Sequence, residues 1–378
     1  MKIAINGILL NFNRKTDGIG RYIASLLREF EAHKEHTFYV FVDRLYKYKE
    51  LKNGFEPDNI VPVFIPLPVF SPLLRKIWTF WLMPLFASFI RIEVCFAPDG
   101  FLPAWGFKKY VTTIHDLAFI KYPETVTSQS LKMLRDYYGR AISKSDKVIT
   151  VSNCSKEDIL KYYDIPESKV EVVYNGSSEI FFQEIPSEEC RRLSEKFDIS
   201  EPYLFYYGKI EPRKNLVSVV KAFTIVKEKH QKLKLMIAGR EGWLSSDLHE
   251  MVEKNSWKDD IKFLGPLSDL EIKFLLENAL AFIYIPLYEG FGLPVVEAMA
   301  CGANIITSNV SSIPEVVGDC GIVVQPENIQ EIAHAVLKLI EECACGKKSN
   351  LNAVERAGKF NWKDSAKRHI QIMNDLIS

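Results

Sequence analysis

Two glutamates eight positions apart, Glu289 and Glu297, flank a glycine-rich turn and the start of a predicted helix in the second half of the chain. Pro294 suits the first helical position, because the N–H that proline lacks would be unpaired there. The preceding turn, with Gly290 and Gly292, presents backbone N–H groups at the positive end of the helix dipole, where phosphate binds readily. Glu297 can accept hydrogen bonds from a diol such as a ribose, and Glu289 from a second polyhydroxylated group. The pattern predicts a nucleotide-sugar site.

A pair of adjacent cations, Arg213 and Lys214, follows the first predicted strand of the second half, where a helix begins. Arginine offers a planar fork to phosphate oxygens, lysine offers a mobile point charge, and the helix N-terminus adds to both. We expect these groups to stabilise the charge that grows on a leaving diphosphate. The alternative is structural: solvated surface cations, with Glu289 a turn residue and Glu297 a partner of the helix dipole.

The sequence contains no Asp-x-Asp, and no cluster of histidines and carboxylates has the spacing of metal ligands. We therefore expect no metal and no required cofactor. Arg213, Lys214 and helix N-termini would then handle the charge of the leaving group. A loss of activity in EDTA that Mg²⁺ or Mn²⁺ restores would overturn this expectation.

Weaker motifs lie in the first half of the chain. Gly18 and Gly20 stand between the first strand and the first helix, where glycines let the backbone approach a ligand closely. They do not complete the dinucleotide fingerprint, which disfavours a dehydrogenase. His115 follows another strand, from which an imidazole can reach a sugar hydroxyl. The alternative is a turn in which Asp116 bonds the local backbone and His115 is packed or exposed.

Composition narrows the class of protein. The 378 residues suggest two or three domains, and equal numbers of basic and acidic residues, 48 of each, give no global field that favours nucleic acid. The seven cysteines are scattered and odd in number, so we expect reduced thiols and a cytoplasmic protein. The N-terminus has no signal-peptide pattern. The longest uncharged apolar stretch, Ile77 to Ile90, is shorter than the ~20 residues of a spanning helix.

Short apolar runs alternate with helical patterns along the whole chain, which is typical of parallel sheets covered on both faces. In the first half the predicted strands are Lys2–Asn6, Thr37–Val42, Ile60–Ile65, Val94–Ala97, Tyr110–Ile114, Lys147–Val151 and Val170–Tyr174. In the second half they are Tyr203–Tyr207, Lys234–Ala238, Ile261–Leu264, Ala281–Ile285, Asn304–Thr307 and Gly321–Val324.

The predicted fold class is α/β, with two doubly wound, Rossmann-like domains whose parallel sheets face a central cleft. We expect an acceptor-side domain at 1–180 and a nucleotide-sugar domain at 201–360. The polar segment 181–200 lacks a strong period and is the expected linker. A helix at about 361–378 is expected to pack back on the first domain.

Together these motifs resemble the retaining glycosyltransferases of family 4, which have the GT-B fold. The resemblance covers most of the chain and is strongest over Tyr206–Asn215 and Glu289–Gly321. The segments Gly18–Tyr22 and His115–Leu117 are most similar to the bacterial mannosyltransferase-like branch. Two departures, Ile285-Pro286 and Ala303-Asn304-Ile305, lie near the expected donor pocket and concern the identity of the sugar.

The resemblance assigns a role to each site residue. Glu289 would bind the hydroxyls of the donor sugar and Glu297 the ribose, while Arg213 and Lys214 would bind the diphosphate. His115 would lie beside the transferred sugar. The resemblance also implies donor contacts from the backbone of a loop in each domain: Gly18 and Gly20 in the first, and Phe291, Gly292 and Leu293 in the second.

The implied enzyme is a retaining hexosyltransferase of polysaccharide biosynthesis that acts on a glycan or a lipid-linked oligosaccharide. GDP-mannose is the first expected donor, on the family branch alone, and a UDP-hexose is the second. One alternative is a non-hydrolysing sugar-nucleotide epimerase, which would act on the donor without an acceptor. Another is a nucleotide-sugar-binding protein that has no turnover.

Residues 69–90 carry a second hypothesis. Trp78, Phe80, Trp81, Leu82 and Met83 lie beside basic residues, a composition that suits docking on the inner face of a membrane. The favoured alternative is a buried helix of the first domain that is broken at Pro84.

Overall fold

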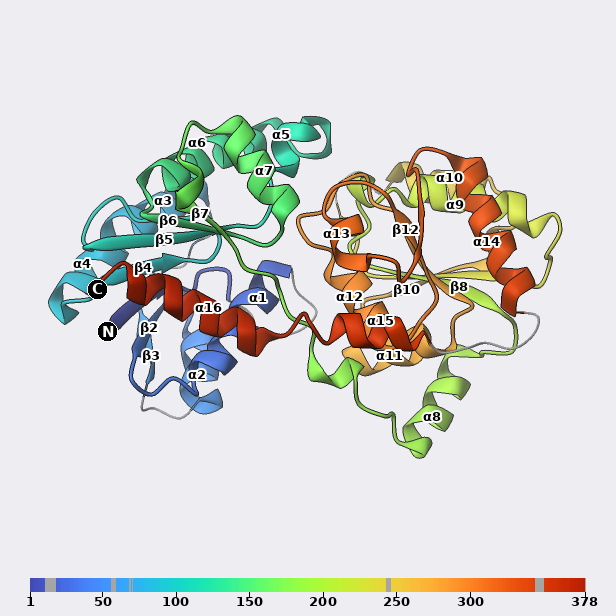
Figure 1. Ribbon diagram of the computed structural model, residues 1–378, viewed down its shortest axis with the longest axis horizontal. Helices are drawn as coiled ribbons and strands as arrows, with labels where there is room; N and C mark the ends of the chain where they lie inside the picture. The colour runs from blue at the N-terminus through green and yellow to red at the C-terminus, as the bar shows by residue number, and fades with distance from the viewer. Residues whose placement is uncertain are drawn as a thin grey trace. The chain divides into compact units, whose positions relative to one another are not determined.

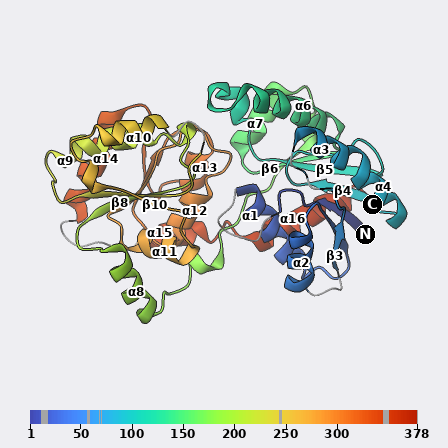
Figure 2. The ribbon, with the colours of Figure 1, turned by 180° about the vertical axis from the view of Figure 1, so that it is seen from behind.

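The computed structural model describes residues 1–10, 18–55, 59–67, 69, 71–242, 246–343 and 350–377. The chain forms two compact units (Figures 1 and 2). The first unit comprises Met1–Phe119, Thr127–Asn175 and Trp362–Ser378, and the second comprises Ile120–Val126 and Gly176–Asn361.

The first unit is built on a parallel sheet, which within the described residues has seven strands in the order β3-β2-β1-β4-β5-β6-β7. Its inner strands are mostly buried because they are continuous apolar runs between two helical layers, while the edge strands β3 and β7 are mostly half-buried. They are β1 (Lys2–Asn6), β2 (Thr37–Val42), β3 (Ile60–Phe64), β4 (Val94–Ala97), β5 (Lys109–Ile114), β6 (Lys147–Thr150) and β7 (Val170–Val172).

Helices cover both faces of this sheet (Figures 1 and 2). One face carries α1 (Gly18–Phe30), α2 (Leu45–Gly54) and the C-terminal helix α16 (Trp362–Asp375). The other helical segments of this unit are α3 (Pro72–Ile77), the π turn η1 (Trp78–Leu82), α4 (Met83–Ile90), α6 (Ser128–Lys144) and α7 (Asn153–Tyr162), with a short 3₁₀ turn at Glu167–Lys169. Helix α5 (Ala118–Lys121) begins in the first unit and ends in the segment Ile120–Val126 of the second unit, which also contains the 3₁₀ turn Pro123–Thr125.

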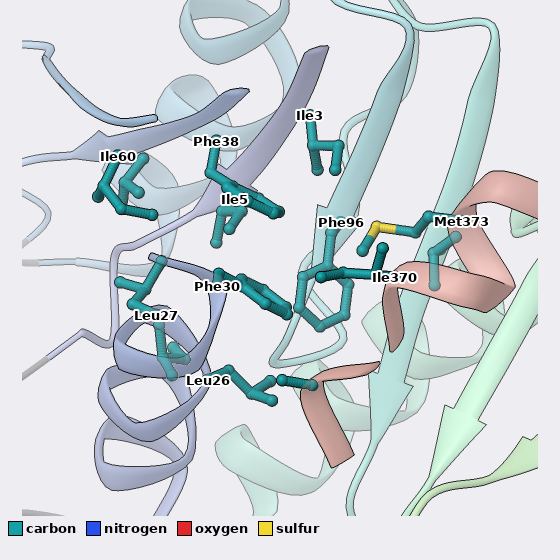
Figure 3. Close-up of a cluster of buried hydrophobic side chains, with 14 of the residues drawn as sticks. Ile3, Ile5, Leu26, Leu27, Phe30, Phe38, Ile60, Phe96, Ile370 and Met373 are labelled. Carbon is teal, nitrogen blue, oxygen red and sulfur yellow. The ribbon is translucent and has the colours of Figure 1, made fainter. Parts of the chain in front are cut away.

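Helix α16 joins the first unit through one apolar stripe. Its residues Ala366, Ile370 and Met373 recur at helical spacing and are buried in the same core as Phe30 of α1 and Phe96 of β4 (Figure 3). Removing a side chain of this size from a packed core costs about 2–5 kcal/mol. The last helix of the chain is therefore a structural part of the unit that contains the first strand.

The segment 72–90 differs from the expected broken helix. It is continuous through Pro84, because the turn before the proline widens and the Met83 N–H bonds the Trp78 carbonyl, five residues back. Proline has no N–H to donate to the preceding turn, and its ring clashes with the carbonyl of that turn. The additional residue of the π turn removes this clash. Pro84 is buried rather than being a break, and a stripe of apolar side chains remains exposed.

The second unit contains a parallel sheet in the order β10-β9-β8-β11-β12-β13, counted over the described part of the chain. The strands are β8 (Tyr203–Tyr207), β9 (Lys234–Ala238), β10 (Ile261–Gly265), β11 (Ala281–Tyr284), β12 (Ile305–Ser308) and β13 (Ile322–Val324). The helices are α8 (Ser187–Phe197), α9 (Leu216–Lys227), α10 (Ser246–Glu253), α11 (Asp269–Asn278), α12 (Leu293–Ala300), α13 (Ile313–Val317), α14 (Ile329–Cys343) and α15 (Leu351–Ala357). The 3₁₀ turns are Glu179–Phe181, η5 (Pro212–Lys214) and Lys258–Asp260.

The segment 181–200, expected as a linker, lies inside the second unit. Most of it is the helix α8, which buries Leu193 and Phe197 four positions apart and leaves most of its other residues exposed. A charged segment with so few apolar residues has the composition of a linker. The chain passes between the units at Asn175–Gly176 and at Asn361–Trp362, and it also enters and leaves the second unit with the short segment Ile120–Val126.

Candidate functional site

The candidate site of the second unit lies where β8 and β11 end. The two strands are neighbours and parallel, so their carboxyl ends meet at the same edge of the sheet. Lys214 follows β8 on the turn η5, and Glu289 follows β11. The Lys214 ammonium donates to the Glu289 carboxylate and, at 2.9 Å, to the Tyr284 hydroxyl. The same hydroxyl donates to Glu289 Oε1 at 2.5 Å, which closes a buried triangle.

Arg213 extends this cluster. Its Nη1 donates to the Tyr288 carbonyl at 2.9 Å and lies 3.7 Å from Glu289 Oε2. Its Nη2 donates to Glu211 Oε1 at 3.1 Å, and Lys209 Nζ lies 3.2 Å from the other oxygen of Glu211. Three basic side chains thus surround two carboxylates at one strand end. The structure brings Arg213, Lys214 and Glu289 together, and their role as donor ligands stays a prediction.

Burial and charge act in opposite directions on the central pair. Burial alone would raise the pKa of Glu289, but the Lys214 and Arg213 cations hold the pKa of that carboxyl below its usual range. Burial lowers the pKa of Lys214, and the Glu289 carboxylate offsets part of that decrease. Glu289 is therefore ionised at neutral pH, and the arrangement depends on its cations.

The turn that carries Glu289 is held from both sides of its peptide. The Glu289 N–H donates to Ser311 Oγ at 2.9 Å, and the Ser312 hydroxyl donates to the Glu289 carbonyl at 2.9 Å. Gly292, which caps α12, has a φ of 99°, and a Cβ there would meet Ile313 Cδ1 at 2.8 Å. Only glycine fits this position without strain. Phe291 and Leu293 flank it, Phe291 being buried and Leu293 half-buried.

Glu297 lies in α12 and is only 1% exposed. It accepts a hydrogen bond at Oε2 from the hydroxyl of Tyr207, the last residue of β8. The end of β8 and the turn η5 after it therefore supply partners to both predicted carboxylates. Different side chains bond the two acids: Lys214 and Tyr284 bond Glu289, and Tyr207 bonds Glu297.

His115 is half-buried at the carboxyl end of β5 in the first unit. Its Nε2 lies 2.8 Å from the Pro98 carbonyl, which can only accept, so Nε2 carries the proton. Burial lowers the pKa of His115, and the imidazole is neutral at pH 7. Its neighbour Asp116 accepts the Ala118 N–H at 3.0 Å, a local turn bond of the kind that the structural alternative requires.

Sequence reasoning missed the groups that hold His115. The ring of Tyr22 packs edge-on against the imidazole with centroids 4.6 Å apart. The Tyr22 hydroxyl lies 2.9 Å from Thr113 Oγ1 and 2.7 Å from Nε2 of His369, which belongs to α16. Burial lowers the pKa of His369 to about 4, so its Nδ1–H donates to the Ser365 carbonyl and its Nε2 accepts from Tyr22.

The remaining predicted residues of the first unit are the two glycines. Gly18 is the first residue of α1 and Gly20 lies in its first turn, where Gly20 is buried and Gly18 exposed. Both glycines therefore lie in the helix and not in the loop that the resemblance implies. The residues before them, 11–17, lie outside the described part of the chain.

The described residues contain no group of three or more histidines, cysteines or carboxylates that could hold a metal ion. Of the other partners that sequence reasoning missed, Tyr207 and Tyr284 are the last residues of their strands. That position is the one signal that could have identified them, because strand ends line the ligand edge of a parallel sheet. Glu211 could have been identified by its position two residues before Arg213, on the segment that follows β8.

Two family models match the chain and together cover most of it. "Glycosyltransferase Family 4" matches residues 16–178, and "Glycosyl transferases group 1" matches residues 190–359. The first falls mainly on the unit that contains His115. The second falls on the unit that contains the cluster of Arg213, Lys214 and Glu289.

Two similar curated proteins come from bacterial O-antigen synthesis. O-antigen chain mannosyltransferase B of Escherichia coli is 28% identical over 269 residues, which are 71% of this chain and 70% of that protein. O-antigen chain mannosyltransferase RfbU of Salmonella typhimurium is 26% identical over 272 residues, 72% of this chain and 71% of that protein.

Among solved structures, Anabaena HepE in complex with UDP-glucose is similar to this chain with a TM-score of 0.76. The sequences are 18% identical, and the match covers 99% of this chain and 100% of HepE. A likeness at this identity establishes the fold. The two α/β units with parallel sheets are those of the GT-B fold, as the sequence predicted.

Proposed function

We propose that this chain, which belongs to the glycosyltransferases described by the family 4 and group 1 models, transfers a hexose from a nucleotide-sugar to a carbohydrate hydroxyl. The observation that carries the proposal is the cluster at the ends of β8 and β11, where Arg213 and Lys214 share Glu289. Clustered cations at the ligand edge of a parallel sheet suit a diphosphate, and a carboxylate among them suits the hydroxyls of a sugar.

The proposed reaction keeps the configuration of the anomeric carbon. The acceptor hydroxyl attacks on the face from which the diphosphate leaves, and a phosphate oxygen takes the hydroxyl proton. Arg213 and Lys214 stabilise the charge that develops on the leaving diphosphate, where a preorganised cation has its largest effect on rate. Neutral His115, whose Nε2–H is held by the Pro98 carbonyl, accepts a hydrogen bond at Nδ1 from a hydroxyl of the transferred sugar, and no covalent intermediate is needed.

Glu297 is the proposed ligand of the donor ribose. Tyr207 donates to one of its oxygens, and a ribose diol would either share the carboxylate with that hydroxyl or displace it. The backbone of Phe291, Gly292 and Leu293 would approach the donor at the start of α12. Gly18 and Gly20 would serve the phosphates from the first unit.

GDP-mannose is the donor that we place first. The support comes from the relatives, since two of the most similar curated proteins are named mannosyltransferases. A UDP-hexose is the second candidate, and the support is that HepE was solved with UDP-glucose. The proposed acceptor is a glycan or lipid-linked oligosaccharide of polysaccharide biosynthesis, at the cytoplasmic face of the membrane.

The decisive experiment incubates the protein with pooled nucleotide sugars and a panel of oligosaccharide acceptors, and measures release of GDP and UDP. We expect release of one nucleotide that depends on an acceptor and is lost in Arg213→Gln. Conversion of the donor without any acceptor would indicate the epimerase instead, and binding without turnover would indicate a binding protein. Arg192→Gln, an exposed arginine of α8 in the same unit, is the matched control.

Two further measurements test the mechanism. The product should have the anomeric configuration of the donor, which NMR of the purified product determines, and an inverted anomer would contradict same-face attack. Activity should persist in EDTA, because the cations of the cluster replace a divalent ion in the proposed reaction. A loss that Mg²⁺ restores would show that the ion is required.

A further inference from the structure

The longest exposed apolar feature of the first unit is a stripe along α3, η1 and α4. Its side chains recur every four residues and face solvent, with 66% of Leu73, 65% of Trp81 and 80% of Phe89 exposed. The positions between them, Ile77 and Leu85, are exposed as well. We call these five residues the apolar stripe. Soluble proteins rarely leave so many large apolar side chains contiguous on one surface.

The π turn keeps the stripe on one side of the helix. In a regular α-helix, every step of four residues rotates the side chain by about 40° around the axis, so five such positions would wind away from a common surface. The wider turn Trp78–Leu82 contains an additional residue and reverses part of this drift. The opposite side of the same helix stays in the core, where Trp78, Met83 and Ala87 are buried.

A second exposed tryptophan belongs to the same surface. Gly106 has a φ of 97°, and a Cβ there would meet Pro84 Cβ at 2.7 Å, so the loop around it lies against the helix. Trp105, the residue before it, is exposed. Trp105 therefore lies in the loop that contacts the helix at the buried proline. Tryptophan prefers the boundary between lipid headgroups and acyl chains, because its ring is apolar and its N–H is polar.

The segment that carries the stripe contains basic but no acidic side chains. From Ser71 to Ile92 the chain contains three cations and no carboxylate. Two more cations contact this segment: Lys2 Nζ donates to the Ile90 carbonyl at 3.1 Å, and the Arg140 guanidinium lies over the Phe80 ring at 5.1 Å. Long basic side chains beside an apolar surface can keep their heads at the level of anionic headgroups.

We propose that the apolar stripe and Trp105 dock the first unit on an anionic lipid bilayer, with the helix lying in the plane of the interface. This inference rests on the first unit alone and does not depend on the donor site. Leu73–Ile90 is long and apolar enough to cross a membrane by length and composition. Spanning would require Trp78, Met83 and Ala87 to leave their core, so the helix lies on the surface instead. A second copy is disfavoured, because two identical faces would bring like charges together.

The test is co-sedimentation with vesicles of phosphatidylcholine, with or without phosphatidylglycerol. We expect the wild-type protein to bind the vesicles that contain phosphatidylglycerol, and to bind them less at high salt. The double variant Trp81→Gln/Phe89→Gln should reduce the partition coefficient by about tenfold or more, since each buried methylene contributes to membrane binding. Both side chains are exposed, so the variant should keep the melting temperature and the activity on a water-soluble acceptor.

The matched control replaces two exposed apolar side chains of the second unit, Phe182→Gln/Leu351→Gln. It should bind vesicles as the wild type does. Equal binding by wild type and Trp81→Gln/Phe89→Gln, or no binding of the wild type to anionic vesicles, would overturn the proposal. So would a concentration-dependent dimer in sedimentation velocity that the same double variant abolishes, because the stripe would then be an interface between copies.

Discussion

Replacing Glu289 with glutamine tests the buried charge cluster, because it leaves Lys214 without a carboxylate. Lys214 retains the Tyr284 hydroxyl as a neutral partner. A lysine with an ordinary pKa of about 10.4 needs about 5 kcal/mol to lose its proton at pH 7, which bounds the cost. Burial already lowers the pKa of Lys214 in the wild type, so deprotonating it in the variant costs less than this bound. Breaking a buried pair costs about 3–5 kcal/mol, and we expect the lower end for Glu289→Gln.

The reverse change, Lys214→Met, leaves Glu289 with the Tyr284 hydroxyl and with Arg213 at 3.7 Å. We expect it to destabilise the second unit by about 2–3 kcal/mol, since a more distant cation remains. The double variant Lys214→Met/Glu289→Gln contains no unpaired charge at the pair. It should therefore be less destabilised than the sum of the single variants by at least about 1 kcal/mol.

Hydrogen exchange measured by mass spectrometry suits this cycle, because a chain of two units does not unfold in one step. Amides of β8 and β11 report the free energy of opening next to the pair, and amides of β1 in the first unit serve as an internal control. If the single and double variants have additive effects on β8 and β11, the two charges are not coupled and the reasoning fails. A Glu289→Gln variant whose second unit is as stable as that of the wild type would also refute the reasoning.

Two more predictions concern the supports of the site. Gly292→Ala should destabilise the second unit by about 1–3 kcal/mol. Adding Ile313→Val should recover part of this stability, because valine lacks the Cδ1 atom that the new Cβ would meet, and thermal unfolding can measure both effects. Burial lowers the pKa of His369 to about 4 in the folded state, so between about pH 6.5 and 4 this histidine binds a proton only in the unfolded state. The free energy of unfolding of the first unit should therefore fall as the pH is lowered through this range. The difference is worth about 3 kcal/mol, and His369→Gln should abolish that part of the slope in β1 amide exchange between the two pH values.

The strands were predictable because a parallel sheet covered on both faces demands continuous apolar runs. Each of the thirteen predicted strands coincides with an observed strand to within two residues at either end. Helices that bury few apolar side chains were not predicted. Helix α2 buries only Lys47 and Leu51, and α8 only Leu193 and Phe197, so their sequences have the polar composition of linkers.

The site was predictable where its residues are neighbours in sequence or follow a strand. Arg213 and Lys214 are adjacent and follow β8, whereas Glu289, 75 positions from Lys214, follows β11. The hydrogen bond from the Tyr207 hydroxyl to Glu297 depends on how β8 packs against α12, and no local sequence pattern encodes that packing. The bond between Tyr22 and His369 joins residues 347 positions apart, and it exists because the last helix folds back on the first sheet. Such pairs require the tertiary structure.

Calorimetric titration with the donor that nucleotide release identifies tests the central claim most directly. We expect Arg213→Gln to weaken donor binding by about tenfold or more, because a lost hydrogen bond to a charged phosphate is worth about 1.5–3 kcal/mol. Arg192→Gln, at an exposed ion pair of the same unit, should bind as the wild type does. Equal donor affinity and equal turnover in wild type and Arg213→Gln would contradict the account, because the diphosphate would then lie elsewhere.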